Sequence, residues 1–196
     1  MAAHNVAILL FDEVEVLDFC GPFEVFSVVD AYNPVRPFHV YTVAEKTPIL
    51  ARNGLSVNPT YLLDDPSCPV PDLIVVPGGR GTRQAMLNER LLAWIRTNAR
   101  RAQLTLSVCT GALMLARAGL LEGLSATTHH SALEELRAVA PNTVILPDQR
   151  IVDNGNIIVS AGISAGIDMA LHVVARLCGV EMARQTAAYM EYDWRT

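Results

Sequence analysis

A single cysteine stands where a short apolar run gives way to a helical pattern. Residues 104–108 read as a strand, and Cys109, Thr110 and Gly111 precede an apolar helix that Gly119 closes. A helix N-terminus offers unpaired N–H groups and a partial positive charge, which favour a thiolate and lower its pKa. The position predicts a nucleophile, with the Thr110 amide free to bind an oxyanion. The alternative is a small core residue, because free cysteines are commonly buried.

Asp18 is the candidate acid. It lies in the segment VEVLDFCGPFEVF, between Leu17 and Phe19. A carboxyl group among apolar neighbours has a raised pKa and can donate or relay a proton. Alternatively, Asp18 is a capping or turn residue just ahead of a helix that we expect at 22–31, with Pro22 in its first turn.

The segment VVPGGRGT, residues 75–82, is rich in glycine. It lacks the Gly-Lys-Ser/Thr end of a phosphate-binding loop and the complete dinucleotide fingerprint. We expect Gly78 and Gly79 to bring backbone N–H groups close to a small substrate, because glycine permits such an approach. A plain tight turn is the alternative.

Two adjacent histidines, His129 and His130, occur in SATTHHSALEEL. We expect their side chains to point in different directions, so that the pair does not chelate a metal ion. One of them could reach a cleft beside Cys109. The other is expected at the surface or at a helix start.

Residues 162–166, GISAG, match the nucleophile elbow of serine hydrolases. That chemistry needs an acid and then a distant histidine downstream. Here Asp168 and His172 follow within two turns of one helix, and no histidine comes later. A serine triad cannot be assembled in this order, and Ser164 is expected to cap the helix instead.

Apolar runs alternate with helical patterns along the chain. Strands are expected at 5–11, 38–45, 72–79, 104–108 and 143–147, hairpins at 49–63 and 151–162, and helices at 22–31, 88–101, 131–139, 164–178 and 180–191. Apolar strands separated by helices indicate an α/β fold with a mainly parallel sheet covered on both faces. In such sheets sites gather at the carboxyl ends of strands, which brings Asp18, Gly78, Gly79 and Cys109 to one edge.

Length and composition limit the function classes. The chain has 196 residues and no Pro/Gly/Ser-rich linker, so we expect a single domain over residues 1–196. A net charge of -5 without a basic cluster argues against nucleic-acid binding, and no apolar run has the length of a membrane span. The N-terminal apolar stretch has no basic leader. Four widely spaced cysteines without a CxxC pair favour a reducing cytoplasm over a zinc site or disulfides.

Five segments together carry a resemblance to a known family. In chain order they are VAILLFDEVEVLDFCGPFEVF, LIVVPGG, SVCTGALMLARAGLLEG, ATTHH and IIVSAGISAGIDMALHVVARLCG. They resemble the ThiJ/PfpI family of class I glutamine-amidotransferase-like proteins, and within it the isonitrile hydratases and the amidotransferase-like domains of AraC-type regulators. The resemblance covers nearly the whole chain. It implies a flavodoxin-like three-layer sandwich, a homodimer and a cysteine in a strained nucleophile elbow.

The resemblance also implies roles for individual residues. Cys109 takes the place of the nucleophile and Asp18 that of the acid beside the sulfur. Gly79 and Thr110 would supply amides to the oxyanion site, and His129 would lie near the pocket. Thr110 replaces the histidine that follows the cysteine in peptidase members, which argues against peptidase activity. The only late histidine, His172, lies in a helix, which argues against a glutamine amidotransferase.

The function that this resemblance implies is a hydro-lyase similar to isonitrile hydratase. Such an enzyme adds water to an isocyanide, a small molecule, and needs no metal or organic cofactor. The alternative is a non-catalytic redox sensor or small-ligand trap, since an exposed thiol of low pKa oxidises readily. Glyoxalase-like chemistry fits less well, because it requires a glutamate where the chain has Asp18.

Overall fold

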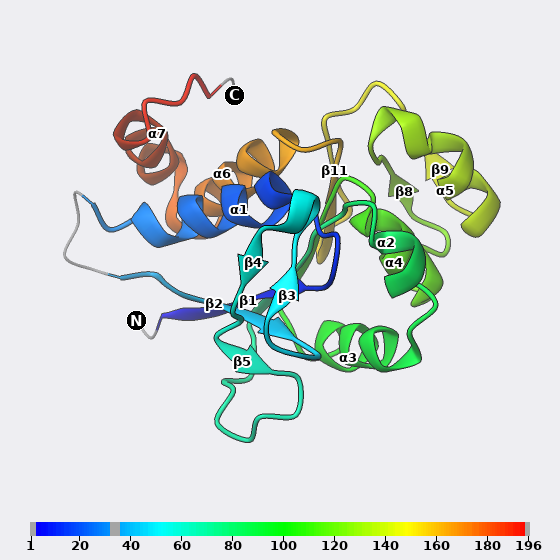
Figure 1. Cartoon of the computed structure of the whole chain (residues 1–196). Helices are drawn as coiled ribbons and strands as arrows, with labels where there is room; N and C mark the ends of the chain where they lie inside the picture. Colours follow the sequence, from blue (N-terminus) through cyan, green and yellow to red (C-terminus); the bar gives the residue numbers. More distant parts are fainter. Residues whose placement is uncertain (1–2, 32–35, 195–196) are drawn as a thin grey trace.

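A seven-stranded sheet forms the centre of the computed structural model, which describes residues 3–31 and 36–194 (Figure 1). Its strands are β1 (His4–Leu10), β2 (Phe38–Ala44), β5 (Tyr61–Leu62), β6 (Leu73–Val76), β7 (Leu104–Val108), β10 (Ile151–Asp153) and β11 (Ile157–Ser160). The strand order is β10-β11-β7-β6-β1-β2-β5. All neighbouring strands run parallel except β10, which pairs antiparallel with β11.

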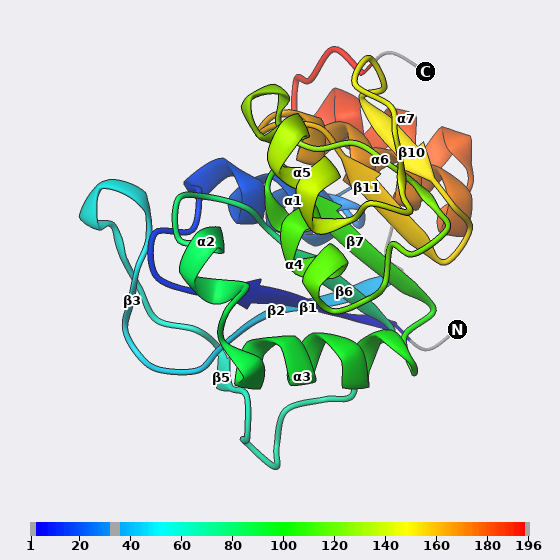
Figure 2. The ribbon, with the colours of Figure 1, turned by 90° about the vertical axis from the view of Figure 1, so that its right-hand side faces the viewer.

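Helices cover both faces of this sheet. One face carries α1 (Val16–Val28), α6 (Ala165–Cys178) and α7 (Val180–Tyr189), which pack against one another. The other carries α2 (Thr82–Ala85), α3 (Glu89–Ala99) and α4 (Gly111–Arg117), and α5 (Leu133–Val139) packs on α4. Figure 2 shows α3 on the opposite side of the sheet from α1, α6 and α7. The predicted α/β class, with a mainly parallel sheet between two helical layers, is confirmed.

Burial on both faces explains the apolar composition of the central strands. Residues 6–10 of β1 and all of β6 and β7 are buried. A parallel strand covered by helices above and below has no solvent-exposed face, so residues 6–10 and 73–76 are continuous apolar runs, while β7 also buries Thr105 and Ser107. These strands end together at the edge that holds Asp18 and Cys109.

The first helix begins six residues earlier than expected. It runs from Val16 to Val28, so Asp18 lies in its first turn and Pro22 lies inside the helix. A proline at an interior position cannot donate the usual helical hydrogen bond. The same helix buries three of its own large apolar side chains, Phe19, Val25 and Phe26, against the rest of the protein. The free energy gained by this burial outweighs the missing hydrogen bond.

The smaller elements depart from the expected boundaries. The hairpin pairs β3 (Ile49–Leu50) with β4 (Ser56–Val57) around a short 3-10 helix, η1 (Arg52–Gly54), whereas β5 joins the central sheet. The expected strand at 143–147 is only β9 (Val144–Ile145), paired with β8 (Ser125–Ala126) in a separate sheet. A 3-10 turn, η2 (His130–Ala132), precedes α5. Among the described residues, no helix is long and apolar enough to cross a membrane.

Candidate active site

The turn after β7 holds Cys109 in a strained backbone conformation. Its φ is 57°, in the left-handed region that residues other than glycine rarely adopt. Two hydrogen-bonded contacts hold it there. The Cys109 N–H lies 3.0 Å from the Ala161 carbonyl oxygen, and the Thr128 hydroxyl donates to the Cys109 carbonyl at 2.7 Å. The neighbouring strand and a distant threonine therefore build the elbow, and the sequence pattern had not singled out Thr128.

Asp18 reaches the sulfur from the first turn of α1. Its side chain is fully buried, and its Oδ2 accepts a hydrogen bond of 3.0 Å from the Gly78 N–H. Gly78 must lack a side chain, because a Cβ there would lie 2.5 Å from the Thr110 nitrogen. The Cys109 thiol interacts directly with the Asp18 carboxyl group. The structure thus brings together the predicted nucleophile and the predicted acid.

Burial sets the proton affinity of this pair. Burial raises the pKa of Asp18 to about 7, as the sequence predicted. The predicted lowering of the thiol pKa is wrong: burial, followed by the Asp18 charge, raises the pKa of Cys109 to about 12. The Thr110 and Ile163 amides bond to the sulfur and oppose this rise, but burial outweighs them because Cys109 is only 6% exposed.

Above about pH 7, the pair therefore holds one proton between two buried groups. Moving that proton from the thiol to the carboxyl group leaves the net charge of the pair unchanged and creates the thiolate. In this arrangement a thiolate at Cys109 arises by proton transfer to Asp18 and not from a thiol of low pKa. The two amides then stabilise the negative charge on sulfur.

Thr110 and Gly79 are joined by a hydrogen bond. The Gly79 N–H donates to Thr110 Oγ1 at 2.9 Å, and the Thr82 hydroxyl lies 2.9 Å from the same oxygen. The Gly79 amide is thus already occupied, in contrast to the expected free oxyanion donor. The Thr110 side chain fixes the glycine loop, and its backbone N–H faces the sulfur.

The turn after β11 contributes a group that the sequence analysis missed. Ile163 has a φ of 49°, and its N–H bonds to the Cys109 sulfur. The GISAG pattern could have pointed to it, since the pattern marks a sharp strand-to-helix turn. Ser164 lies at the N-cap position of α6 but makes no capping hydrogen bond. Its exposed hydroxyl accepts from Arg150 Nη2 at 3.1 Å.

The two histidines lie side by side. Their ring centroids are 4.1 Å apart and tilted by 35°, so the expectation that they point in different directions is wrong. The chain turns into η2 at this point, which brings the rings together. His129 Nδ1 accepts the Ser131 N–H, which leaves its proton on Nε2 in the neutral ring. Burial, followed by His130, lowers the pKa of His129.

A cavity of about 320 Å³ opens above the sulfur. Cys109, Thr110, Ile163 and His129 line it together with four charged residues, which we call its rim: Glu15, Arg52, Arg80 and Arg83. The ring of His129 lies against the backbone of Gly162, where a Cβ would come 2.3 Å from Cδ2. Within the described ranges, no group of three or more His, Cys, Asp and Glu side chains could hold a metal ion.

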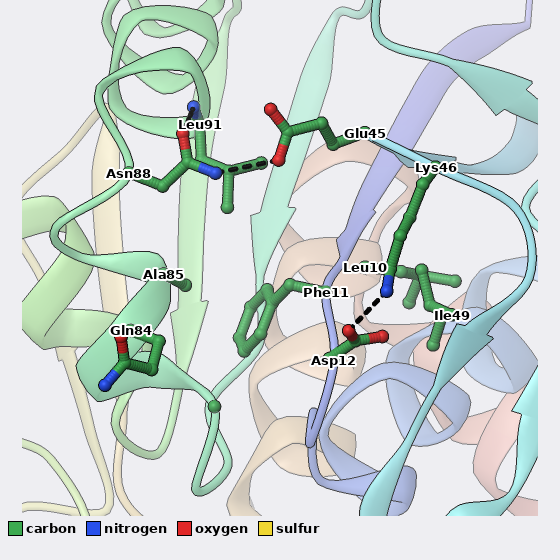
Figure 3. A pocket seen from close by; sticks show the side chains of 11 residues that line it. Leu10, Phe11, Asp12, Glu45, Lys46, Ile49, Gln84, Ala85, Asn88 and Leu91 are labelled. Carbon is green, nitrogen blue, oxygen red and sulfur yellow. Dashed lines mark hydrogen bonds and ion pairs between the residues drawn. The ribbon is translucent and has the colours of Figure 1, made fainter.

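A second cavity of about 310 Å³ lies between the ends of β1 and β2 and the helices α2 and α3 (Figure 3). Four of its polar side chains are paired: Lys46 lies 2.6 Å from Asp12, and Asn88 donates to Glu45 at 2.7 Å. Neither a cysteine nor a histidine lines it. Of these two cavities, only the Cys109 cavity is lined by a cysteine and a histidine.

Comparison with known proteins agrees with this geometry. The sequence profile of the DJ-1/PfpI family matches residues 4–176. The chain belongs to the DJ-1/PfpI family. Its DJ-1/PfpI relatives include isonitrile hydratase from Pseudomonas putida, 38% identical over 97% of this chain and 79% of that protein. The transcriptional regulator CdhR from Pseudomonas aeruginosa is 31% identical over 91% of the chain, which spans about half, 52%, of that regulator.

Solved structures show the same DJ-1/PfpI architecture. A ThiJ/PfpI family protein from Pseudomonas syringae superposes with a TM-score of 0.87 at 31% identity, covering 100% of this chain and 78% of that one. DJ-1beta from Drosophila melanogaster reaches a TM-score of 0.85 at 19% identity, covering 98% and 100% of the two chains. The second match shows the shared fold alone.

Proposed function

We propose that this DJ-1/PfpI protein is a cysteine-dependent hydro-lyase that adds water to an isocyanide and releases an N-substituted formamide. One observation carries the proposal. Asp18 is fully buried beside Cys109, and its Oδ1 has no hydrogen-bond partner among the described residues. A buried carboxyl group with a pKa of about 7 can take up a proton from the thiol and deliver it to a substrate atom. The relation to isonitrile hydratase supports the same chemistry.

The first half of the reaction joins the thiol to the isocyanide carbon. The thiol proton passes to Asp18, and the Cys109 sulfur attacks the terminal carbon of R–N≡C. Asp18 then returns that proton to the same carbon, which gives the thioimidate R–N=CH–S–Cys109. One S–H bond and one N–C π bond of the isocyanide are broken, and one C–S bond and one C–H bond are formed.

The second half adds water and releases the product. The Asp18 carboxylate, now without its proton, accepts one from a water molecule as the oxygen attacks the thioimidate carbon. The nitrogen takes up this proton, and the C–S bond breaks to give R–NH–CHO. The remaining hydroxyl proton returns to the Asp18–Cys109 pair, which restores the starting state.

The redox alternative requires a thiol that is exposed and readily ionised. Cys109 is buried, with only 6% of its surface exposed. This burial favours hydration over sensing.

The test is turnover of cyclohexyl isocyanide, with N-cyclohexylformamide followed by mass spectrometry. We expect many equivalents of product for each protein molecule and none from Cys109→Ser. The same samples are treated with hydrogen peroxide, and the mass of the peptide containing Cys109 is followed. Stoichiometric oxidation without any formamide would overturn the proposal in favour of the redox alternative.

A further inference from the structure

The rim of the Cys109 cavity is rich in arginine. Arg52, Arg80 and Arg83 line it, with Glu15 as the only acidic residue among the lining residues. They come from three segments: Arg52 from η1, Arg80 from the loop after β6 and Arg83 from α2. In a chain whose net charge is -5, this gathering of positive charge at a reactive thiol requires an explanation.

Arg83 is held in place by protein contacts. Its Nε and Nη2 atoms lie 3.2 Å and 2.6 Å from the two carboxylate oxygens of Glu135 on α5. Its Nη1 lies 3.5 Å from the Gly79 carbonyl oxygen. The bidentate pair fixes the guanidinium plane beside the cavity and compensates its charge.

The other two arginines are less well compensated. Arg52 Nη1 lies 4.0 Å from Glu15 Oε2, at the limit of an ion pair. No described residue forms a hydrogen bond or ion pair with the Arg80 guanidinium, whose side chain is exposed. Three guanidinium groups thus face two carboxylates, Glu15 and Glu135. The neutral ring of His129 adds no further charge.

The second cavity shows that the protein can neutralise such a rim. There Lys46 pairs with Asp12, and Glu45 pairs with Arg90, which lies outside the cavity lining. At the Cys109 cavity the corresponding pairing is incomplete. A guanidinium without a protein partner at the mouth of a cavity is suited to a planar anion of the ligand.

We propose that the substrate carries a carboxylate distal to its reactive carbon, and that Arg80, assisted by Arg52, binds this carboxylate at the cavity mouth. This inference rests on the proposed function, and it narrows the substrate class to isocyanides that bear a carboxylate. The cavity volume of about 320 Å³ fits a small molecule of this kind.

The first test compares two substrates that differ in charge. Isocyanoacetate and methyl isocyanoacetate are assayed at low ionic strength, where surface charges are least screened. We expect kcat/KM to be about tenfold higher for the anion, the gain of one charge-assisted contact. Arg80→Gln removes this preference, and Arg80→Lys retains part of it. Arg100→Gln, the same charge change at the opposite edge of the sheet, is the matched control and keeps the preference.

The second test does not depend on hydration. Iodoacetate and iodoacetamide alkylate Cys109 through the same carbon and differ in charge, and peptide mass mapping gives both rates. We expect the ratio of the iodoacetate rate to the iodoacetamide rate to fall about tenfold in Arg80→Gln and to stay constant in Arg100→Gln. Equal ratios in all three proteins would overturn the inference. Failure of both isocyanides together with a changed alkylation ratio would overturn the proposed reaction and leave anion recognition standing.

Discussion

Two turns at the same edge of the sheet have nearly the same backbone conformation but contribute different groups to the site. Cys109 follows β7 and Ile163 follows the neighbouring strand β11, with Ser160 in register with Val108. Their φ angles are 57° and 49°, and a helix begins shortly after each turn. A positive φ at a residue other than glycine is strained, so both shapes are imposed by the surrounding structure.

The difference lies in what each turn faces. The first directs a thiol into a buried site beside Asp18. The second presents its Ile163 N–H to that thiol and leaves the Ser164 hydroxyl exposed near Arg150. A sharp strand-to-helix turn is therefore not sufficient for a nucleophile. The turn at Ile163 contributes one backbone amide to the Cys109 sulfur.

Replacing the nucleophile is the strongest test of this comparison. Cys109→Ser should lower isocyanide turnover by roughly 10⁴-fold or more, because the hydroxyl is a far weaker nucleophile. The substitution is nearly isosteric, so thermal unfolding followed by circular dichroism should change little. Cys68→Ser, on the loop between β5 and β6, is the matched control and should keep turnover within a few-fold. A folded Cys109→Ser variant with normal turnover would show that the first turn is not the reactive one.

Replacing Asp18 should separate isocyanide turnover from the reactivity of the Cys109 thiol. Asp18→Asn should lower turnover about 10²- to 10⁴-fold, since the proton donor is lost. The Asp18 charge raises the pKa of Cys109, so alkylation of Cys109 by iodoacetamide should be retained or become faster. Slower alkylation together with slower turnover would instead indicate that the variant has lost the local structure.

The same pair predicts the pH profile of the native protein. At low pH, Asp18 and Cys109 are both protonated and no proton can move from sulfur to the carboxyl group. As pH rises through about 7, the pair loses one of its two protons, and kcat/KM should rise to a plateau. The second proton is lost only near pH 12. A profile that stays flat between pH 5 and 9, read from initial rates, would contradict the shared proton.

Adding a side chain at Gly162, between the second turn and His129, should have an intermediate effect on stability and turnover. Gly162→Ala places a Cβ 2.3 Å from His129 Cδ2, so the ring or the turn must move. We expect a loss of ~1–3 kcal/mol in the free energy of unfolding, as for other overpacked sites, together with reduced turnover. In the Gly162→Ala/His129→Ala double variant the ring is absent, and the stability cost should be smaller than the sum of the two single costs. Additive costs in urea unfolding would argue against this contact.

The hydroxyl of the second turn should matter least. Ser164→Ala removes one exposed hydrogen bond to Arg150 and no helix cap. Turnover should stay within a few-fold, and the free energy of unfolding should change by no more than ~0.5 kcal/mol. Complete loss of turnover in a folded Ser164→Ala variant would restore the serine as a nucleophile and reverse the comparison.

The order of strands and helices could be read from the sequence alone. Apolar runs such as residues 6–10 and 73–76 are continuous because both faces of a parallel sheet are covered, and this local pattern is visible in the residue types. The position of Cys109 between a strand and a helix was visible for the same reason. The placement of Asp18 at the same edge followed from the rule that strand ends carry sites.

Only the tertiary structure decided how the site works. The raised pKa of Cys109 depends on burial by segments far apart in the chain, and no local pattern reports that depth. The Ile163 amide, the bond between Gly79 and Thr110, and the Thr128 contact depend likewise on neighbouring strands. Residue type fixes which groups can react. Packing fixes how far these groups are buried from water and which hydrogen-bond donors contact them. Burial and hydrogen bonding together determine whether the shared proton lies on Asp18 or on Cys109.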